Sequence, residues 1–163
     1  MCIRDRPNTE KLKEIGIDFQ FNGDKMIVDG TGNRRPIDIR TLPYPGFPTD
    51  MQPQMMALLA LTEGVSIITE TVFENRFMHV SELVRMGANI KIDGRIAIIE
   101  GVKKLTGCEV KATDLRAGAA MVIAGLVANG YTEIGDIYHI DRGYTNVEDK
   151  FSELGAEIYR IQR

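Results

Sequence analysis

Two stretches of the chain are apolar on nearly every face. Residues 55–61 and residues 119–128 contain no polar side chain. A helix at the surface keeps one polar face, so a helix without one is buried on all sides. The longer stretch is about half of the roughly 20 residues that a membrane span requires. Both stretches therefore predict buried helices rather than membrane anchors.

Each apolar stretch carries the signals of helix ends. Asp50 and Asp114 each follow a threonine ahead of the stretch, where a carboxylate can accept backbone N–H groups as an N-cap. Gly64 and Gly130 come after the stretches, and glycine commonly ends a helix. We expect nearly fully buried helices that run from the two aspartates to residues 61 and 128.

Segments of alternating character follow the buried helices and predict strands at 65–69 and 132–137. An amphipathic helix is expected after each strand. Its apolar face consists of Val80, Leu83 and Val84 in one copy, and of Val147, Phe151 and Leu154 in the other. Hairpins are expected where Asp93-Gly94 separates 90–92 from 96–99, and where Asn22-Gly23-Asp24 separates 19–21 from 26–28.

This order of signals occurs twice, which identifies an internal repeat. The interval from the glycine to the next arginine is 12 residues in both copies, from Gly64 to Arg76 and from Gly130 to Arg142. We expect α/β units with the order helix, strand, helix, strand, strand, in which parallel buried helices begin at one surface and sheets cover them. The units span about 8–47 (partial), 48–111 and 112–163.

The composition is that of an ordinary globular domain, with 44% apolar and 26% charged residues. A net charge of −3 without a basic stripe argues against a nucleic-acid or membrane partner. Cys2 and Cys108 form no CxxC motif, and His79 and His139 stand alone. These residues suggest no zinc site or disulfide framework and favour a cytoplasmic location.

The first residues need a separate interpretation. The segment before Asn8 has no apolar core of a signal peptide and no periodicity. We expect residues 1–7 to be non-native or disordered.

Charged residues recur at equivalent places in the repeat, whereas standard motifs are absent. The sequence has no P-loop, HExxH motif or nucleophile elbow, and Gly30-Thr31-Gly32 fits a turn better than a dinucleotide-binding loop. The recurring residues are Asp50, Arg76, Asp114, Arg116 and Arg142.

Each recurring residue has a structural interpretation beside a functional one. The two aspartates fit helix caps, Arg76 and Arg142 fit structural ion pairs, and Arg116 fits a solvated residue of a first turn. The aromatic neighbours fit packing better than a stacking platform. They are Phe73, Phe77, Tyr138 and Tyr144.

Four strings carry a resemblance to a known family. The longest begins Thr69-Glu70-Thr71-Val72-Phe73-Glu74-Asn75-Arg76, and the others lie at 47–52, 112–117 and 137–144. In order and spacing they closely resemble the UDP-N-acetylglucosamine enolpyruvyl transferases of the EPSP synthase superfamily, over about 8–163. EPSP synthases share the repeat fold but not the longest string.

The resemblance implies an inside-out α/β barrel, with buried parallel helices and outer sheets. It also implies an enzyme of two such domains with the active site between them, of which this chain resembles the C-terminal part of one. The reaction is the transfer of an enolpyruvyl group from phosphoenolpyruvate to the 3-hydroxyl of UDP-N-acetylglucosamine, with release of phosphate, in peptidoglycan synthesis. It requires no cofactor or metal. The missing N-terminal half is the expected partner of this chain.

The resemblance also assigns roles. Asp50 matches the aspartate at the sugar 3-hydroxyl, and Val72 and Phe73 match residues beside the uridine-sugar ligand. Arg76 and Arg142 match arginines that face phosphoenolpyruvate. Asp114 and Arg116 match a further pair in the cleft. Two hypotheses stay open: a truncated part of a working transferase, or an isolated repeat domain that binds a uridine-sugar weakly without catalysis.

Overall fold

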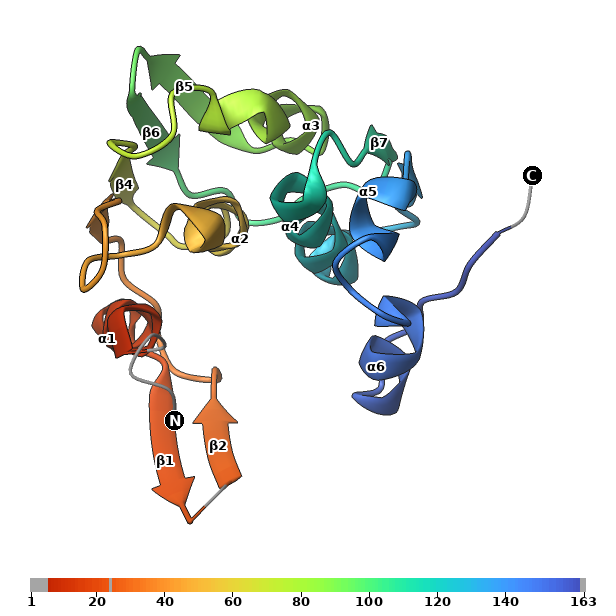
Figure 1. Cartoon of the computed structure of the whole chain (residues 1–163), viewed down its shortest axis with the longest axis horizontal. Coiled ribbons are helices and arrows are strands. Elements are labelled where there is room, and N and C mark those ends of the chain that lie inside the picture. Colours follow the sequence, from red (N-terminus) through yellow and green to blue (C-terminus); the bar gives the residue numbers. More distant parts are fainter. Residues whose placement is uncertain (1–5, 24, 162–163) are drawn as a thin grey trace.

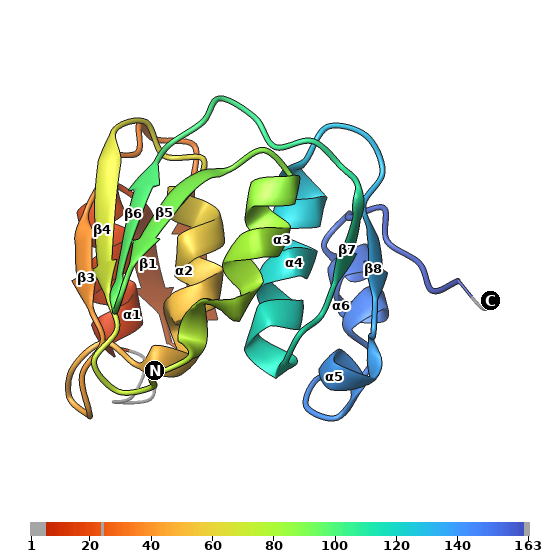
Figure 2. The ribbon, with the colours of Figure 1, turned by 90° about the horizontal axis from the view of Figure 1, so that it is seen from above.

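A layer of helices lies between two sheets in the computed structural model, which describes residues 6–23 and 25–161. Figure 2 shows α2 (Gln52–Leu59), α3 (Val80–Arg85) and α4 (Leu115–Val127) between a four-stranded and a two-stranded sheet. The α/β class is therefore as predicted. No helix in the described part of the chain has the length and apolar character of a membrane span.

The four-stranded sheet has the order β3, β4, β6, β5. β3 runs parallel to β4, and β6 is antiparallel to both of its neighbours. Burial alternates along the strands, so that Ile39, Ile68 and Ile99 face the helices and are almost fully buried. The bounds are β3 (Asp38–Arg40), β4 (Val65–Thr69), β5 (Asn89–Asp93) and β6 (Ile96–Glu100).

Each buried helix connects two parallel strands. β3, α2 and β4 form one such β-α-β unit, and β7 (Glu109–Lys111), α4 and β8 (Glu133–Gly135) form another. The expected order of elements was therefore incomplete: it began each unit with the buried helix and did not include the strand that precedes it, β3 or β7. β3 and β7 have three residues with a single buried side chain each, Ile39 and Val110, which is too short for a recognisable alternation.

The two buried helices run parallel, as predicted, and begin at the same side of the molecule (Figure 2). Met56 and Leu59 of α2 and Met121 of α4 are fully buried in the core between the sheets. The expected burial of α4 is wrong at its end, where Leu126 and Val127 are exposed. Leu126 borders an open groove of about 1120 Å³ that is also lined by α6 (Val147–Glu153), so the last turn of α4 is not covered.

The amphipathic helices are present but shorter than the pattern suggested. Val80 and Leu83 of α3 are buried, whereas Val84, near the end of this short helix, is exposed. The 3-10 turn η3 (Arg76–His79) precedes α3, and the short α5 (Tyr138–Asp141) precedes α6. Leu154 follows the last residue of α6 and is 82% exposed, so it does not belong to the buried face.

The N-terminal part consists of α1 (Arg6–Ile15) and the predicted hairpin of β1 (Asp18–Asn22) and β2 (Lys25–Asp29). The hairpin extends away from the rest of the molecule (Figure 1). Residues 1–5 of the segment expected to be non-native lie outside the described residues. Arg6 and Pro7, however, form the first turn of α1, a position that suits proline because its missing N–H has no partner there.

Candidate functional site

Three of the recurring charged residues meet at the start of the two buried helices. Asp50 lies in the 3-10 turn η2 (Thr49–Met51) ahead of α2, Arg76 begins η3, and Arg116 lies in the first turn of α4. Asp50 Oδ2 lies 2.6 Å from Arg116 Nη2, and Asp50 Oδ1 lies 3.3 Å from Arg76 Nη2. We call these three residues the Asp50 cluster.

The two aspartates have different structural roles. Asp114 caps α4, because its Oδ1 accepts the backbone N–H groups of Arg116 at 2.7 Å and Ala117 at 2.9 Å. The cap predicted for Asp50 is wrong: its side chain makes no capping bond, and α2 begins at Gln52. Pro53 in the first turn of α2 favours this later start, and it was the sequence signal that could have placed it.

Arg76 is held on several sides. Its side chain is only 10% exposed, and its Nε donates to Thr49 Oγ1 at 3.2 Å. Its guanidinium also lies over the ring of Phe73, 4.4 Å from the ring centre, a favourable cation–π geometry. The structural ion pair considered for Arg76 is therefore confirmed, with Asp50 as its partner. Phe73 contacts this cation although its own side chain is half exposed.

Arg116 is more accessible, with a third of its side chain exposed. The hydrogen bond to Asp50 raises the pKa of Arg116 above its usual value, although partial burial opposes the shift. The guanidinium therefore stays charged beside Asp50. Its contact with Asp50 joins residues 66 positions apart in the sequence, so Arg116 is more than a solvated residue of a first turn.

Arg142 lies near this end of the molecule without joining the cluster. It follows α5 and is exposed, and its side chain makes no hydrogen bond or ion pair within residues 6–23 and 25–161. The ion pair considered for Arg142 is therefore not found there. The next residue, Gly143, packs closely against Leu115 of α4, since an added Cβ would come within 2.7 Å of that side chain. The turn that carries Arg142 is thus fixed against the first turn of α4.

Sequence reasoning missed the buried carboxylate of Glu70, which is 1% exposed. Burial alone raises the pKa of Glu70, but hydrogen bonds from Phe73, Thr41, Val72 and Thr49 outweigh it and leave the pKa below its usual value. Glu70 is thus a buried carboxylate held in its ionised form. No pattern in the sequence indicated its burial; only the structure shows that the alternation of buried residues at 66 and 68 continues to 70.

His79 is a second buried polar residue at the site. Its Nδ1 lies 3.1 Å from the carbonyl oxygen of Arg76, and since a carbonyl only accepts, Nδ1 carries the proton. Burial lowers the pKa of His79 to about 4, so the ring is neutral near pH 7. His79 therefore fixes the backbone of Arg76 without adding charge.

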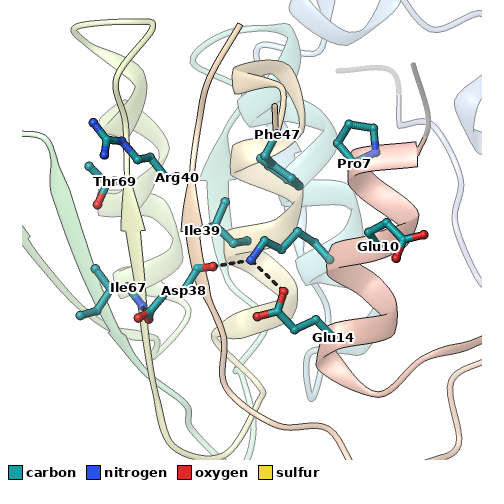
Figure 3. A pocket seen from close by; sticks show the side chains of 10 residues that line it. Pro7, Glu10, Glu14, Asp38, Ile39, Arg40, Phe47, Ile67 and Thr69 are labelled. Atoms are coloured by element: carbon teal, nitrogen blue, oxygen red, sulfur yellow. Dashed lines mark hydrogen bonds and ion pairs between the residues drawn. The ribbon is translucent and has the colours of Figure 1, made fainter. Parts of the chain in front are cut away.

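A separate pocket lies elsewhere in the molecule. Its volume is about 450 Å³, and it lies between α1 and the β3–β4 edge of the sheet (Figure 3). Lys11 lines it and donates to the carbonyl oxygen of Asp38 and to Glu14, both at 2.8 Å, so its charge is used to hold α1 against β3. The pocket contains no member of the Asp50 cluster. The described residues also hold no group of three or more side chains suited to a metal ion.

Comparison with known proteins agrees with the repeat fold. A sequence model of the family EPSP synthase (3-phosphoshikimate 1-carboxyvinyltransferase) matches residues 4–151. The chain is 67% identical over 156 residues to a Clostridium tetani protein named UDP-N-acetylglucosamine 1-carboxyvinyltransferase 2, a match that covers 96% of this chain and 37% of that protein. A protein of the same name, numbered 1, from Caldanaerobacter subterraneus is 64% identical over 150 residues, which are 92% of this chain and 36% of that protein.

Solved structures give the same fold. The enolpyruvyl transferase NikO from Streptomyces tendae matches with a TM-score of 0.86 and 29% identity, over 94% of this chain and 36% of that one. An EPSP synthase from Acinetobacter baumannii matches with a TM-score of 0.59 and 14% identity, over 79% of this chain and 32% of that one, and supports the fold alone. The chain spans little more than a third of the length of the curated relatives named above.

Proposed function

The chain belongs to the EPSP synthase family, and from this we propose that it forms one wall of the active site of an enolpyruvyl transferase acting on UDP-N-acetylglucosamine. The observation that carries the proposal is the Asp50 cluster, which assembles at the start of two parallel buried helices. The names of relatives 64–67% identical to this chain support the acceptor.

The proposed reaction moves the enolpyruvyl group of phosphoenolpyruvate to the 3-hydroxyl of the sugar. The hydroxyl oxygen bonds to C2 of phosphoenolpyruvate and loses its proton, while C3 gains a proton. Phosphate then leaves C2 as C3 gives up a proton, which restores the double bond. The site must therefore accept a proton at the sugar and surround the phosphate and carboxylate with cations.

Asp50 suits the acceptor side of this reaction. Its side chain is about half exposed, so a sugar hydroxyl can reach lone pairs that the two arginines leave free. The arginines fix both oxygens in place, so the carboxylate is oriented before substrate arrives. We assign to Asp50 the role of accepting the hydroxyl proton as the new C–O bond forms. Val72 and Phe73, in the turn after β4, are proposed to line the uridine-sugar.

The cations of the site suit phosphoenolpyruvate. Arg76, Arg116 and Arg142 contribute three positive charges, which balance the negative charges of Asp50, Asp114 and the buried Glu70. The helix N-termini add partial positive charge, which attracts anions. A guanidinium can bind phosphate or carboxylate through two parallel hydrogen bonds. We therefore propose that Arg142, with no partner among the described residues, binds phosphoenolpyruvate, and that Arg76 and Asp114 support the same site.

A chimera tests the proposal. This chain replaces the matching segment of the Clostridium tetani relative, and phosphate release is measured with phosphoenolpyruvate and UDP-N-acetylglucosamine. We expect release only when both substrates are present, and a product with the mass of enolpyruvyl-UDP-N-acetylglucosamine. A folded chimera that releases no phosphate would contradict the proposed function.

A further inference from the structure

The buried carboxylate of Glu70 connects three segments around the site. Its Oε1 accepts the hydroxyl of Thr41 at 2.7 Å and the backbone N–H groups of Val72 at 2.9 Å and Phe73 at 3.0 Å. Its Oε2 accepts the hydroxyl of Thr49 at 2.9 Å. Glu70 thus joins the end of β3, the turn after β4 and the residue next to Asp50.

These bonds compensate for the burial of a charge. A buried carboxylate is unfavourable unless hydrogen bonds replace its lost water, and four donors do so here. No cation lies within ion-pair distance of Glu70 in the described part of the chain. An ionised carboxylate suits this place because both of its oxygens accept and neither donates, so it can serve all four donors.

Glu70 reaches Arg76 by two routes. Through Thr49, whose hydroxyl donates to Glu70 and accepts from Arg76 Nε, it fixes one edge of the guanidinium. Through the backbone of Phe73 it fixes the ring that lies against the guanidinium plane. Arg76 in turn holds Asp50. One buried charge therefore determines where both groups lie.

We propose that Glu70 is a positioning residue for the transferase site: it sets the Val72–Phe73 backbone on the sugar side and the Arg76–Asp50 pair on the reacting side. This inference rests on the proposed function. Glu70 itself is buried and does not touch substrate.

Substitution of Glu70 by glutamine tests the positioning role, because it changes only one of the four hydrogen bonds that Glu70 accepts. The amide oxygen of Glu70→Gln can take the place of Oε1 and keep its three donors. The amide NH₂ group then faces Thr49, whose hydroxyl already accepts from Arg76. The Thr49 hydroxyl then has no acceptor for its own proton, and it faces two donors, the new NH₂ group and Arg76 Nε. The NH₂ group competes with Arg76 for the hydroxyl oxygen and displaces it.

The experiment compares kcat and KM for both substrates in the chimera and its variants. We expect Glu70→Gln to lower kcat about 10- to 100-fold, since a small misplacement of catalytic groups has effects of this size. Thr49→Val removes the hydroxyl that connects Glu70 to Arg76 but leaves Glu70 intact, so it should lower kcat by a similar factor. Thr49→Ser keeps this hydroxyl and should have a kcat close to that of the parent. Glu100→Gln is the matched control: its amide oxygen can still accept the surface hydrogen bond from Asn89, and kcat should stay within about twofold of the parent.

A second measurement is independent of turnover. In the isolated chain, amide exchange of Val72 and Phe73 should be faster in Glu70→Gln than in the parent, because a neutral oxygen is a weaker acceptor than a carboxylate. Unchanged kcat in folded Glu70→Gln and Thr49→Val chimeras would overturn the inference. If the parental chimera is inactive, the proposed function fails, and unchanged amide exchange would then overturn the positioning role by itself.

Discussion

Replacing Asp50 by asparagine separates its three possible roles, which are helix cap, ion-pair partner and proton acceptor. Asparagine is as good an N-cap as aspartate, so a capping residue would tolerate the change. The structure places Asp50 between two guanidinium groups instead. The amide oxygen can still accept from one of them, but the amide NH₂ group then meets the other as donor against donor.

The loss of stability follows from the exposure of the three side chains. Asp50 is about half exposed and Arg116 a third, so their pair contributes about 0.2–1 kcal/mol. Arg76 is only 10% exposed and loses a charged partner, which places its contribution at about 1 kcal/mol. We expect Asp50→Asn to lower the free energy of unfolding by about 1–2 kcal/mol, or the Tm by about 2–8 °C. In the chimera, kcat should fall by roughly two to four orders of magnitude, the effect of losing a positioned base.

Urea unfolding of the isolated chain and steady-state phosphate release by the chimera measure the two effects. Asp114→Asn is the control, because asparagine preserves the cap of α4 and should leave stability within about 0.5 kcal/mol. If Asp50→Asn is as stable as this control, the ion pairs of the Asp50 cluster do not form in solution. If kcat stays near the parental value while stability falls, Asp50 is an ion-pair partner only, and its proposed catalytic role is refuted.

Four further predictions concern single features. Asp114→Ala removes the cap of α4 and should lower the free energy of unfolding by about 1 kcal/mol in urea unfolding, whereas equal stability would exclude the cap. Folding lowers the pKa of His79 from 6.5 to about 4. Between pH 6.5 and pH 4 the unfolded chain therefore binds a proton at His79 that the folded chain excludes. The free energy of unfolding should fall by roughly 3 kcal/mol as the pH drops through this range. His79→Gln should flatten that slope in unfolding measured between pH 4 and 7, and an unchanged slope would show that His79 is not its source. Arg142→Lys should leave stability unchanged and raise the KM for phosphoenolpyruvate in the chimera about tenfold, because lysine lacks the planar fork; an unchanged KM would remove Arg142 from the binding site. The isolated chain should release no phosphate when it is given phosphoenolpyruvate and UDP-N-acetylglucosamine, since catalysis also needs groups from the rest of the enzyme. Phosphate release by the isolated chain would contradict this.

The sequence predicted the parts of the fold that leave a periodic pattern. The buried helices, the hairpins and strand β4 follow from runs of apolar or alternating residues, and the repeat predicted the parallel arrangement of α2 and α4. Strands β3 and β7 could not be predicted, because three residues with one buried side chain carry no period. Their pairing depends on β4 and β8, which are distant in sequence.

The candidate site shows a similar division. The repeat identified Asp50, Arg76 and Arg116 as equivalent charged positions, but their ion pairs join residues 26 and 66 positions apart, which no local pattern reports. The cap expected at Asp50 was wrong because Pro53 and the 3-10 turn delay the helix start. Glu70 was missed because a glutamate after a strand is ordinarily solvated, and its burial depends on donors from three segments.

A crystal structure of the chimera with UDP-N-acetylglucosamine bound tests whether Asp50 faces the acceptor sugar. We expect the sugar 3-hydroxyl within hydrogen-bond distance of the Asp50 carboxylate, with the uridine-sugar against the backbone of Val72. A bound sugar whose 3-hydroxyl lies away from Asp50, with the Asp50 cluster facing solvent, would refute the role proposed for Asp50.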